Sequence, residues 1–279
     1  MKENKKDSLG ERIKEYENVS RIKLPRRIYT MIRIDGKAFH TYTKGLNRPF
    51  DNGFIEDMDA TAAYLCKNIQ GAKLAFVQSD EISILLTDFE TITTDAWFDG
   101  NIQKMASISA SMATAKFNQL RLLRKAIGGG FDANQILQGG GSIGVNEIEN
   151  FKLAEFDSRV FQIPQAVEVE NYLIWRQNDT TRNSIQSVAQ SMFSHSELEN
   201  KNCDQLQEMC FQKGVNWNDF DPKLKRGRMI IKENFECKEV ISDDDKTIPS
   251  YNRTKWISIA PPIFTQDRNF LDKLIPKND

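Results

Sequence analysis

Two acidic residues, Asp35 and Asp80, each stand where an apolar run of the sequence ends. Asp35 follows the β-branched run at 28–34 and precedes Gly36, and this turn dipeptide predicts the end of a strand. Asp80 lies in the bend between two predicted strands, 74–77 and 82–86. If the first strand lies beside this hairpin, the two carboxylates share one edge of the sheet. They would repel each other there unless a cation lies between them.

The cation that such a pair favours is Mg²⁺, which takes oxygen ligands, keeps several waters and shares its site with substrate phosphates. Two such ions about 4 Å apart can hold the attacking and leaving oxygens of an in-line displacement at phosphorus. The sequence therefore predicts a nucleotidyl-transfer site. For each motif taken alone an alternative stays open, because Asp-Gly is a common hairpin turn and Asp-Glu at a bend is often only a solvated loop.

The strands and helices predicted to hold these acids follow the order βαββαβ along the chain. After the first strand, apolar residues from Phe54 to Ile69 recur at helical spacing, and Asp51 and Asn52 precede them as candidate caps. The hairpin comes next, then a long helix over 102–123 and a strand around 159–163. This order predicts an α+β fold with a ferredoxin-like βαββαβ unit, the architecture of the palm of polymerases and nucleotide cyclases.

The rest of the chain divides around this unit. We expect an N-terminal extension at 1–25, a palm-like catalytic core at 26–165 with a Gly-rich insertion near 128–141, and a helical and C-terminal part of the same catalytic unit at 166–279. The two glycine triplets of the insertion lack the Gly-Lys-Ser/Thr of a P-loop and the strand before it, so they predict a flexible insertion. Helices are expected over 166–193 and 206–211, Trp217 is expected to pack instead of stacking on RNA, and the acidic run 243–245 is expected to be an exposed turn.

Composition limits the classes of function. The chain has 38 basic and 39 acidic residues and a formal charge of −1, so contact with RNA must come from local basic patches. For the second of three candidate patches, a favourable charge near a helix C-terminus is the simpler interpretation. The three patches are Arg21, Lys23, Arg26 and Arg27; Arg121, Arg124 and Lys125; and Lys223, Lys225, Arg226 and Arg228.

The four cysteines form no Cys-x-x-Cys pair and have no neighbouring histidine, which indicates neither a zinc site nor a disulfide framework and fits a reducing cytoplasm. The first eleven residues are polar and lysine-rich, unlike an ordinary secretion signal. No apolar run is long enough to cross a bilayer, so we expect a cytoplasmic protein with no membrane partner.

Further motifs occur in order between about residues 26 and 232, and with the acid pair they resemble the tRNA-histidine guanylyltransferase family, in particular its bacterial and archaeal guanylyltransferase-like branch. Members extend nucleic acid in the 3′-to-5′ direction. The motifs are Arg33-Ile34-Asp35-Gly36, Phe39-His40, Arg48-Pro49-Phe50-Asp51, Gln78-Ser79-Asp80-Glu81, Lys104 ahead of Ala110-Ser111, Phe156-Asp157-Ser158-Arg159-Val160 with Pro164, Tyr172-Leu173-Ile174-Trp175-Arg176-Gln177-Asn178-Asp179, Arg182-Asn183-Ser184, Phe193-Ser194-His195-Ser196-Glu197-Leu198 and Gly214-Val215-Asn216-Trp217.

The chain departs from the eukaryotic members at two places. They carry His-Ile-Asn-Asn after the Trp-Arg-Gln helix, where Thr181-Arg182-Asn183-Ser184 stands here. A paired arginine that precedes the lysine aligned with Lys104 is also replaced, because Gly100 and Asn101 stand there. The resemblance therefore implies template-dependent repair of RNA 5′ ends, especially of truncated tRNAs, and not strict specificity for histidine tRNA.

The resemblance also implies roles for individual residues. Asp35 and Asp80 would be the catalytic ligands of two Mg²⁺ ions, with the carbonyl oxygen of Gly36 as a third ligand. Glu81 is a secondary catalytic candidate, because adjacent strand side chains point to opposite faces. The implied nucleotide-binding residues are Asp35, Gly36, Lys37, Ala38, Phe39, His40, Arg48, Asp51, Ser79, Asp80, Lys104 and Asn183.

Within that set, the loop from Gly36 to His40 would line the triphosphate, with backbone N–H groups and Lys37 facing phosphate and Phe39 or His40 flanking a base. His40 is equally compatible with a packed turn histidine. Ser79 would donate its hydroxyl to a phosphate, and Arg48 and Lys104 would hold the triphosphate. Candidates for binding a second nucleotide or the RNA end are Asn183, Arg176, Asp179 and Lys225. Arg176 and Asp179 can also simply pair along a helix.

The implied reaction uses ATP to activate a 5′-monophosphate end, or uses a 5′-triphosphate directly, after which the 3′-hydroxyl of GTP or another nucleoside triphosphate attacks the 5′ phosphorus. The expected partner is tRNA or a tRNA-like RNA with an incomplete 5′ end, and the expected assembly is a homotetramer. Two alternatives stay open. One is a palm-type nucleotide cyclase or dinucleotide synthase, which needs no RNA, and the other is a catalytically silent RNA-binding module.

Overall fold

The structure is a computed structural model that describes residues 8–128, 151–237 and 251–278 of the 279-residue chain. Most of the predicted Gly-rich insertion and the whole acidic run at 243–245 lie outside the described residues. None of the helices in the described part is long and apolar enough to span a bilayer.

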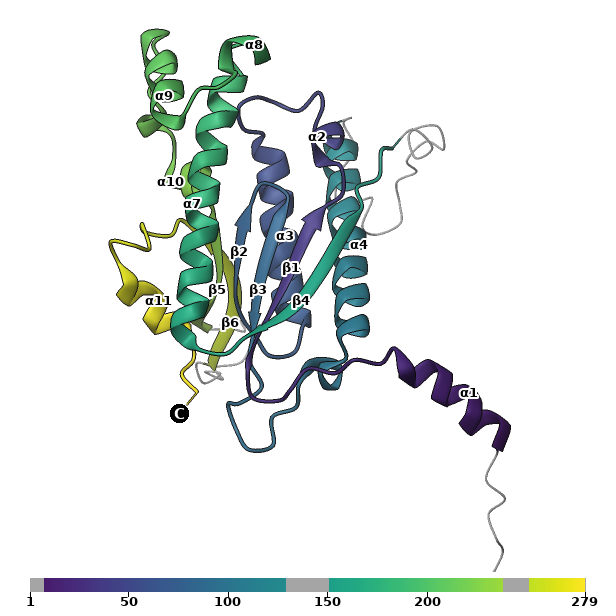
Figure 1. The fold of residues 1–279 in the computed structure, drawn as a ribbon. Coiled ribbons are helices and arrows are strands. Elements are labelled where there is room, and N and C mark those ends of the chain that lie inside the picture. The colour runs from purple at the N-terminus through teal and green to yellow at the C-terminus, as the bar shows by residue number, and fades with distance from the viewer. Residues whose placement is uncertain (1–7, 129–150, 238–250, 279) are drawn as a thin grey trace, which may run out of the picture.

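One antiparallel sheet organises the molecule, with the strand order β4-β1-β3-β2-β5-β6 (Figure 1). Its first four strands are β1 (Tyr29–Gly36), β2 (Ala72–Gln78), β3 (Glu81–Leu86) and β4 (Phe156–Ile163). Helix α3 (Asn52–Asn68) connects β1 to β2, and helix α4 (Ile102–Gly128) connects β3 to β4. The predicted ferredoxin-like βαββαβ unit is therefore confirmed.

Alternation along the strands fixes which face each side chain occupies. In β1, Ile32 and Ile34 are fully buried in the core shared with α3 and α4. Tyr29 and Met31 belong to a second core, which helices α7 (Ala166–Gln190) and α11 (Arg268–Leu274) cover on the opposite face (Figure 1). By the same alternation, the odd-numbered residues at the end of β1 lie on the α7 face.

Helix α3 forms where its apolar spacing predicts. Phe54, Met58, Ala62 and Leu65 are all at most 7% exposed and face the sheet. The helix begins at the predicted cap, because Oδ1 of Asp51 accepts a hydrogen bond from the Phe54 N–H at 2.7 Å.

A helical lobe continues from the end of α7. It contains α8 (His195–Leu198), α9 (Cys203–Gln212), the 3₁₀ turn η2 (Trp217–Asp219) and α10 (Pro222–Arg226). Trp217 is 7% exposed in the core of this lobe, and its Nε1–H donates to Ser184 Oγ at 3.1 Å. The prediction that Trp217 packs is confirmed. The remaining short elements are α1 (Ser8–Val19), α2 (Phe39–Tyr42) and η1 (Trp97–Gly100).

The hairpin of β5 (Arg228–Cys237) and β6 (Tyr251–Ile259) extends the sheet and was not predicted. Only its first residues, Arg228 to Ile231, pair with β2. Beyond them the two strands pair with each other alone, so both faces can be polar and the apolar alternation of a half-buried strand is weak. Several predicted elements also differ at their ends. β4 begins at Phe156, α9 begins at Cys203 and α4 continues to Gly128, whereas α7 ends earlier, at Gln190.

Candidate active site

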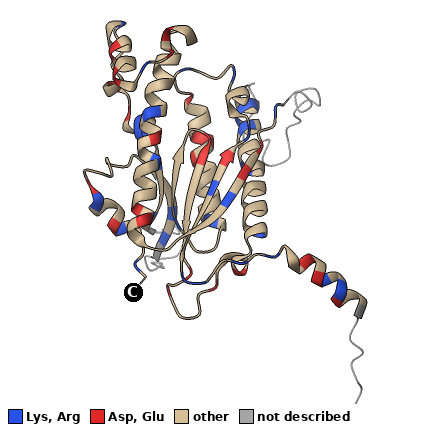
Figure 2. Ribbon diagram, viewed as in Figure 1, with Lys and Arg blue, Asp and Glu red and all other residues tan. Residues whose placement is uncertain are grey.

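Antiparallel pairing of β1 with β3 brings the two acids of the predicted site to one end of the sheet. Ile34 pairs with Ile82, so Asp35 at the end of β1 lies beside the turn that precedes β3. Asp80 occupies that two-residue turn with Ser79, which has a left-handed φ of 43°. Acidic segments gather at this end of the strands in Figure 2. We call this end the acid rim.

The electrostatics of the acid rim indicate that Asp80 is costly to ionise. Its pKa is raised to about 6, mainly by burial and to a lesser degree by the charges of Asp35 and Glu81, against hydrogen bonds from Ser79 and the backbone that lower it. A divalent cation between the carboxylates would remove this cost. Among the described residues, no three His, Cys, Asp or Glu side chains converge to hold an ion by themselves. Mg²⁺ commonly needs only one or two carboxylates beside waters and phosphate oxygens.

Glu81 has a different environment from Asp80. It is 4% exposed, and its Oε2 lies 2.5 Å from Arg33 Nη2 and 2.8 Å from Arg176 Nη1. Its Oε1 accepts a hydrogen bond from Ser83 Oγ at 3.2 Å. Alternation places Glu81 on the α7 face, where the helix covers it. This carboxylate is held in a buried arginine clamp, and a secondary catalytic role for Glu81 stays a prediction.

The clamp extends along α7. Arg176 Nη2 lies 3.4 Å from Asp179, which also pairs with Arg182 and accepts a 3.3 Å hydrogen bond from Asn183 Nδ2. The interpretation of Arg176 and Asp179 as a pair along a helix is thus supported. Asn183 is exposed on the same helix.

The loop after Asp35 has one buried and several exposed members. Phe39 is 4% exposed and packs against the rings of Phe117 and Phe156, so the expectation that it flanks a base is corrected. A Cβ at Gly36 would lie 2.3 Å from the Phe39 ring, which explains the glycine. Ala38 begins α2 with a φ of 54°. Three residues of the loop are exposed: Lys37, Ala38 and His40.

Lys37 pairs with Glu155 across this loop. Its Nζ lies 2.5 Å from Glu155 Oε2, and this carboxylate raises the pKa of the lysine. Both side chains are more than 60% exposed, so the pair contributes little to stability and the lysine is free to exchange it for a phosphate. A cavity of about 140 Å³ adjoins the pair, lined also by Tyr42 and Lys152.

Three of the predicted nucleotide-binding residues lie in different environments. Arg48 is exposed in the loop before α3. Asp51 already uses both carboxylate oxygens, since Oδ1 caps α3 and Oδ2 accepts from the Asn47 N–H at 3.1 Å. Lys104 lies in the first turn of α4, a helix on the sheet face opposite α7, and this turn lies at the far end of β1 (Figure 1). Within one chain, the structure does not bring Lys104 to the acid rim.

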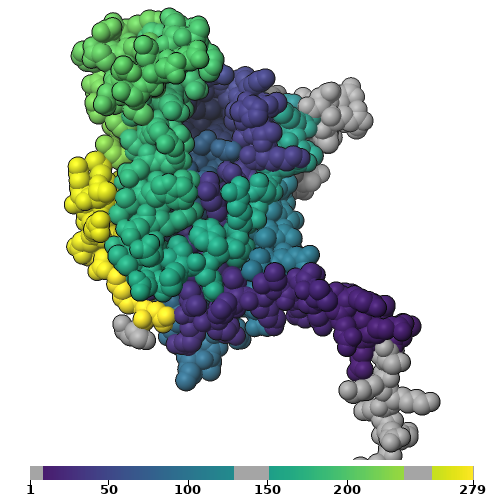
Figure 3. Space-filling model, viewed as in Figure 1, coloured from purple at the N-terminus to yellow at the C-terminus, as the bar shows by residue number. Residues whose placement is uncertain are grey.

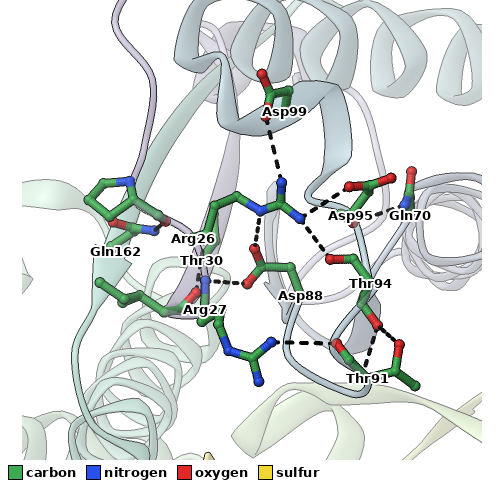
Figure 4. A network of polar contacts seen from close by, with 12 residues as sticks. Arg26, Arg27, Thr30, Gln70, Asp88, Thr91, Thr94, Asp95, Asp99 and Gln162 are labelled. Carbon is green, nitrogen blue, oxygen red and sulfur yellow. Dashed lines mark hydrogen bonds and ion pairs between the residues drawn. The ribbon is translucent and has the colours of Figure 1, made fainter.

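In the first predicted basic patch, the guanidinium of Arg26 is surrounded by three aspartates, as Figure 4 shows. Arg26 Nε donates to Asp88 at 3.0 Å, and its Nη2 and Nη1 lie 3.2 and 3.7 Å from Asp95 and Asp99. Lys23 also pairs with Asp99. Lys23 and Arg26 thus fasten the entry of β1 to the loop after β3, and an RNA-binding role for this patch stays a prediction.

The other two patches also serve the fold in part. Arg121 and Arg124 both hold the buried carboxylate of Asp57, at 3.1 and 2.9 Å. Lys225 is 6% exposed and donates to the Asn218 carbonyl at 2.6 Å, and burial lowers its pKa. Arg228 is 3% exposed and pairs with an aspartate of α3. Lys225 and Arg228 are therefore buried and not available to RNA.

Sequence reasoning assigned no role to two residues that flank the acid rim on β4. The register places Asp157 opposite Asp35, and Arg159 Nη2 lies 3.9 Å from Asp35 Oδ2. Arg159 is 60% exposed, so it can turn from Asp35 to an incoming phosphate. Period-two alternation along 156–163 is the sequence signal that could have found them.

A β4-β1-β3-β2 sheet with one acid ending β1 and another in the β2–β3 turn has the architecture of palm-type enzymes. The family model for tRNAHis guanylyltransferase matches residues 10–164, more than half of the chain. The chain belongs to this family and is a nucleotidyltransferase.

Solved structures and curated relatives agree. The structure is similar to a bacterial tRNA(His) guanylyltransferase-like protein in complex with ATP, at 40% identity and a TM-score of 0.77, covering 96% of this chain and 99% of that one. The complex of such a protein with GTP gives a TM-score of 0.73 at the same identity and coverage. The tRNA(His) guanylyltransferase of Saccharomyces cerevisiae is 29% identical over 74% of this chain and 83% of its own length.

Proposed function

We propose that this protein adds nucleotides to the 5′ end of RNA in the 3′-to-5′ direction, and that its substrate is tRNA or tRNA-like RNA with an incomplete 5′ end. The observation that carries the proposal is the convergence of Asp35 and Asp80 at one rim, where burial, and then the charge of Asp35, raises the pKa of Asp80. The complexes of the bacterial relative with ATP and GTP support nucleoside triphosphates as the second substrate.

The donor set at the rim fits Mg²⁺. Asp35 and Asp80 would hold the ions, with the backbone carbonyl of Gly36 as a further oxygen, and bound Mg²⁺ would supply Lewis acidity at the reacting phosphate and hydroxyl. The nearness of the two carboxylates, together with the raised pKa that burial and then the Asp35 charge give Asp80, supports this fit.

The chain's own residues bind and orient the reactants. We place the triphosphate along the exposed loop from Lys37 to His40, where the Lys37 ammonium can exchange Glu155 for phosphate. Arg48 lies in the next exposed loop, and the Ser79 hydroxyl is exposed at the turn that carries Asp80. The 3′-hydroxyl of the nucleotide forms a bond to the 5′ phosphorus, and pyrophosphate leaves from a 5′-triphosphate end or AMP from an adenylated one.

Location and assembly belong to the proposal as well. We expect a cytoplasmic enzyme, in line with its role in tRNA processing, and a homotetramer, as the resemblance to the family implies. The division of the chain at residues 25 and 165 likewise stays a prediction. Light scattering coupled to gel filtration measures the assembly.

The proposed activity is tested by incubating the protein with Mg²⁺, ATP, GTP and a labelled tRNA that lacks its first 5′ nucleotide. The expected product is one nucleotide longer. Asp35→Asn and Asp80→Asn should each abolish addition, while Asp204→Asn, at an exposed acid of α9, should leave it unchanged. Wild-type rates in the Asp35→Asn/Asp80→Asn double variant would refute the site.

The same reaction mixture without RNA tests the second enzyme candidate. A nucleotide cyclase or dinucleotide synthase forms its product from nucleotides alone, whereas a 5′-end polymerase forms none. A silent RNA-binding module would bind the tRNA and convert neither substrate.

A further inference from the structure

Trp175, in the motif at 172–179, is not explained by the fold. Arg176 is 3% exposed on Glu81, and Gln177 holds the C-terminal segment, since its Nε2 donates to the Pro262 carbonyl at 2.8 Å and its Oε1 accepts from the Phe264 N–H at 2.9 Å. Trp175, between Tyr172 and this pair on the helix, is 52% exposed. A half-exposed indole beside the acid rim offers a face on which a base can stack.

The Trp175 ring is held in place by its neighbours. The guanidinium carbon of Arg176 lies 3.6 Å from the ring centroid, and the ring of Tyr172 lies 5.8 Å away at 64°. Tyr172 is itself fixed, because its hydroxyl lies 2.8 Å from Ser83 Oγ and its ring packs on Phe161 of β4. An aromatic face that is already ordered loses little conformational entropy when a ligand stacks on it.

The position of Trp175 places it near the acid rim. Its neighbour Arg176 reaches Glu81, the residue next to Asp80. Helical spacing of four and seven residues puts Asp179 and Arg182 on the same side of α7, towards the helical lobe. Trp175 therefore lies on a stripe of α7 that passes the acid rim.

The two sides of the acid rim are not equivalent. Helix α2 and its loop lie on one side of the ends of β1 and β3, and α7 lies on the other (Figure 1). Figure 3 shows a recess between the green helical lobe and the purple segment that contains α2. An in-line displacement needs its entering and leaving groups on opposite sides of the phosphorus. In the proposed reaction the leaving group is pyrophosphate or AMP, and the RNA stays bonded to the phosphorus. Because the nucleotide triphosphate is proposed to lie along the α2 loop, the α7 side is left for the RNA end.

We infer that Trp175 is the platform on which a terminal base of the substrate RNA stacks, so that the 5′ phosphorus is held at the acid rim. This inference rests on the proposed function. Stacking on an indole face is available to every base, so it would fix the position of the RNA end without selecting its sequence. The Arg176 guanidinium beneath the ring adds the cation–π contact that keeps the ring in place.

The test measures binding of a tRNA with an incomplete 5′ end by tryptophan fluorescence, without nucleotide. Trp97 and Trp217 are at most 9% exposed and Trp256 packs against the core, so Trp175 should dominate the change. Because base–aromatic stacking is worth about 1–3 kcal/mol, Trp175→Leu should weaken RNA binding, followed by a labelled RNA, about 5- to 150-fold. Trp175→Phe should recover most of it, and nucleotide affinity should stay unchanged in both variants.

Phe211→Leu is the matched control, because Phe211 is 61% exposed on α9 and should not affect RNA binding. Unchanged RNA affinity in Trp175→Leu, with circular dichroism like the wild type, would overturn the inference. So would a loss of nucleotide affinity in place of RNA affinity, or dissociation of an oligomer with RNA affinity intact. If the wild type binds RNA through Trp175 and adds no nucleotide, the proposed function fails and the inference stands.

Discussion

Replacing Arg176 by methionine tests whether the clamp on Glu81 holds the turn that carries Asp80. The variant keeps the volume of the side chain and removes a guanidinium that is 3% exposed and lies 2.8 Å from Glu81 Oε2. Glu81 then keeps Arg33, at 2.5 Å, as its remaining ion-pair partner in the interior. Asp179 keeps its pair with Arg182, so the damage concentrates on Glu81.

The magnitude follows from the burial of the pair. Removing one partner of a buried ion pair costs about 3–5 kcal/mol, and we expect about 3 kcal/mol because Arg33 remains. For a chain of this size that corresponds to a fall of about 6–12 °C in Tm. The measurement is urea unfolding followed by circular dichroism, with the midpoint and the slope fitted separately.

Arg182→Met is the control, since Arg182 also pairs with Asp179 but is 60% exposed. An exposed pair contributes about 0–1 kcal/mol, so this variant should unfold near the wild-type midpoint. The double variant Glu81→Gln/Arg176→Met should be less destabilised than the sum of its two single variants, because they share one interaction. An Arg176→Met variant within 1 kcal/mol of the wild type, or no different from Arg182→Met, would refute the clamp.

Two further substitutions probe the rim itself. Gly36→Ala should lower the free energy of unfolding by about 1–3 kcal/mol, because its Cβ would lie 2.3 Å from the Phe39 ring. Gly128→Ala is the control and should not lower it, since a Cβ there meets nothing within 4 Å. Equal urea midpoints for the two variants would contradict this explanation. Asp80 has a pKa of about 6 in the folded protein and 3.8 as its ordinary value, so the ion-free protein should lose about 2–3 kcal/mol of stability as the pH rises from 4 to 7. Asp80→Asn should lack this loss, and parallel stability–pH curves for the two proteins would show that the carboxyl is not perturbed.

The part of the fold that the sequence predicts is the part with strong periodicity. The βαββαβ unit and the Asp51 cap follow from strand alternation, helical spacing and local side-chain chemistry, and the convergence of Asp35 and Asp80 follows from antiparallel pairing of β1 with β3. The β5–β6 hairpin is not predicted from the sequence, because most of its length pairs with a single neighbouring strand and carries a mixed polar pattern.

The details of the site depend on contacts that no short sequence window contains. The environment of Glu81 is set by Arg176, 95 positions later in the chain. Strand alternation predicts which face of the sheet Glu81 occupies, but not that Arg176 is its partner. The sequence alone places Phe39 in a loop, whereas in the structure its ring packs against Phe117 and Phe156, which are distant in sequence. Lys104 carries the right charge but begins a helix on the opposite face of the sheet.

Binding of Mn²⁺ to the protein with GTP, followed by electron paramagnetic resonance, tests most directly whether Asp35 and Asp80 together hold the metal. We expect the wild type and Asp204→Asn to bind the ion equally, and Asp35→Asn and Asp80→Asn each to weaken binding by at least about tenfold, since each removes one carboxylate ligand. Mn²⁺ affinity that is unchanged in both single variants would contradict a shared site.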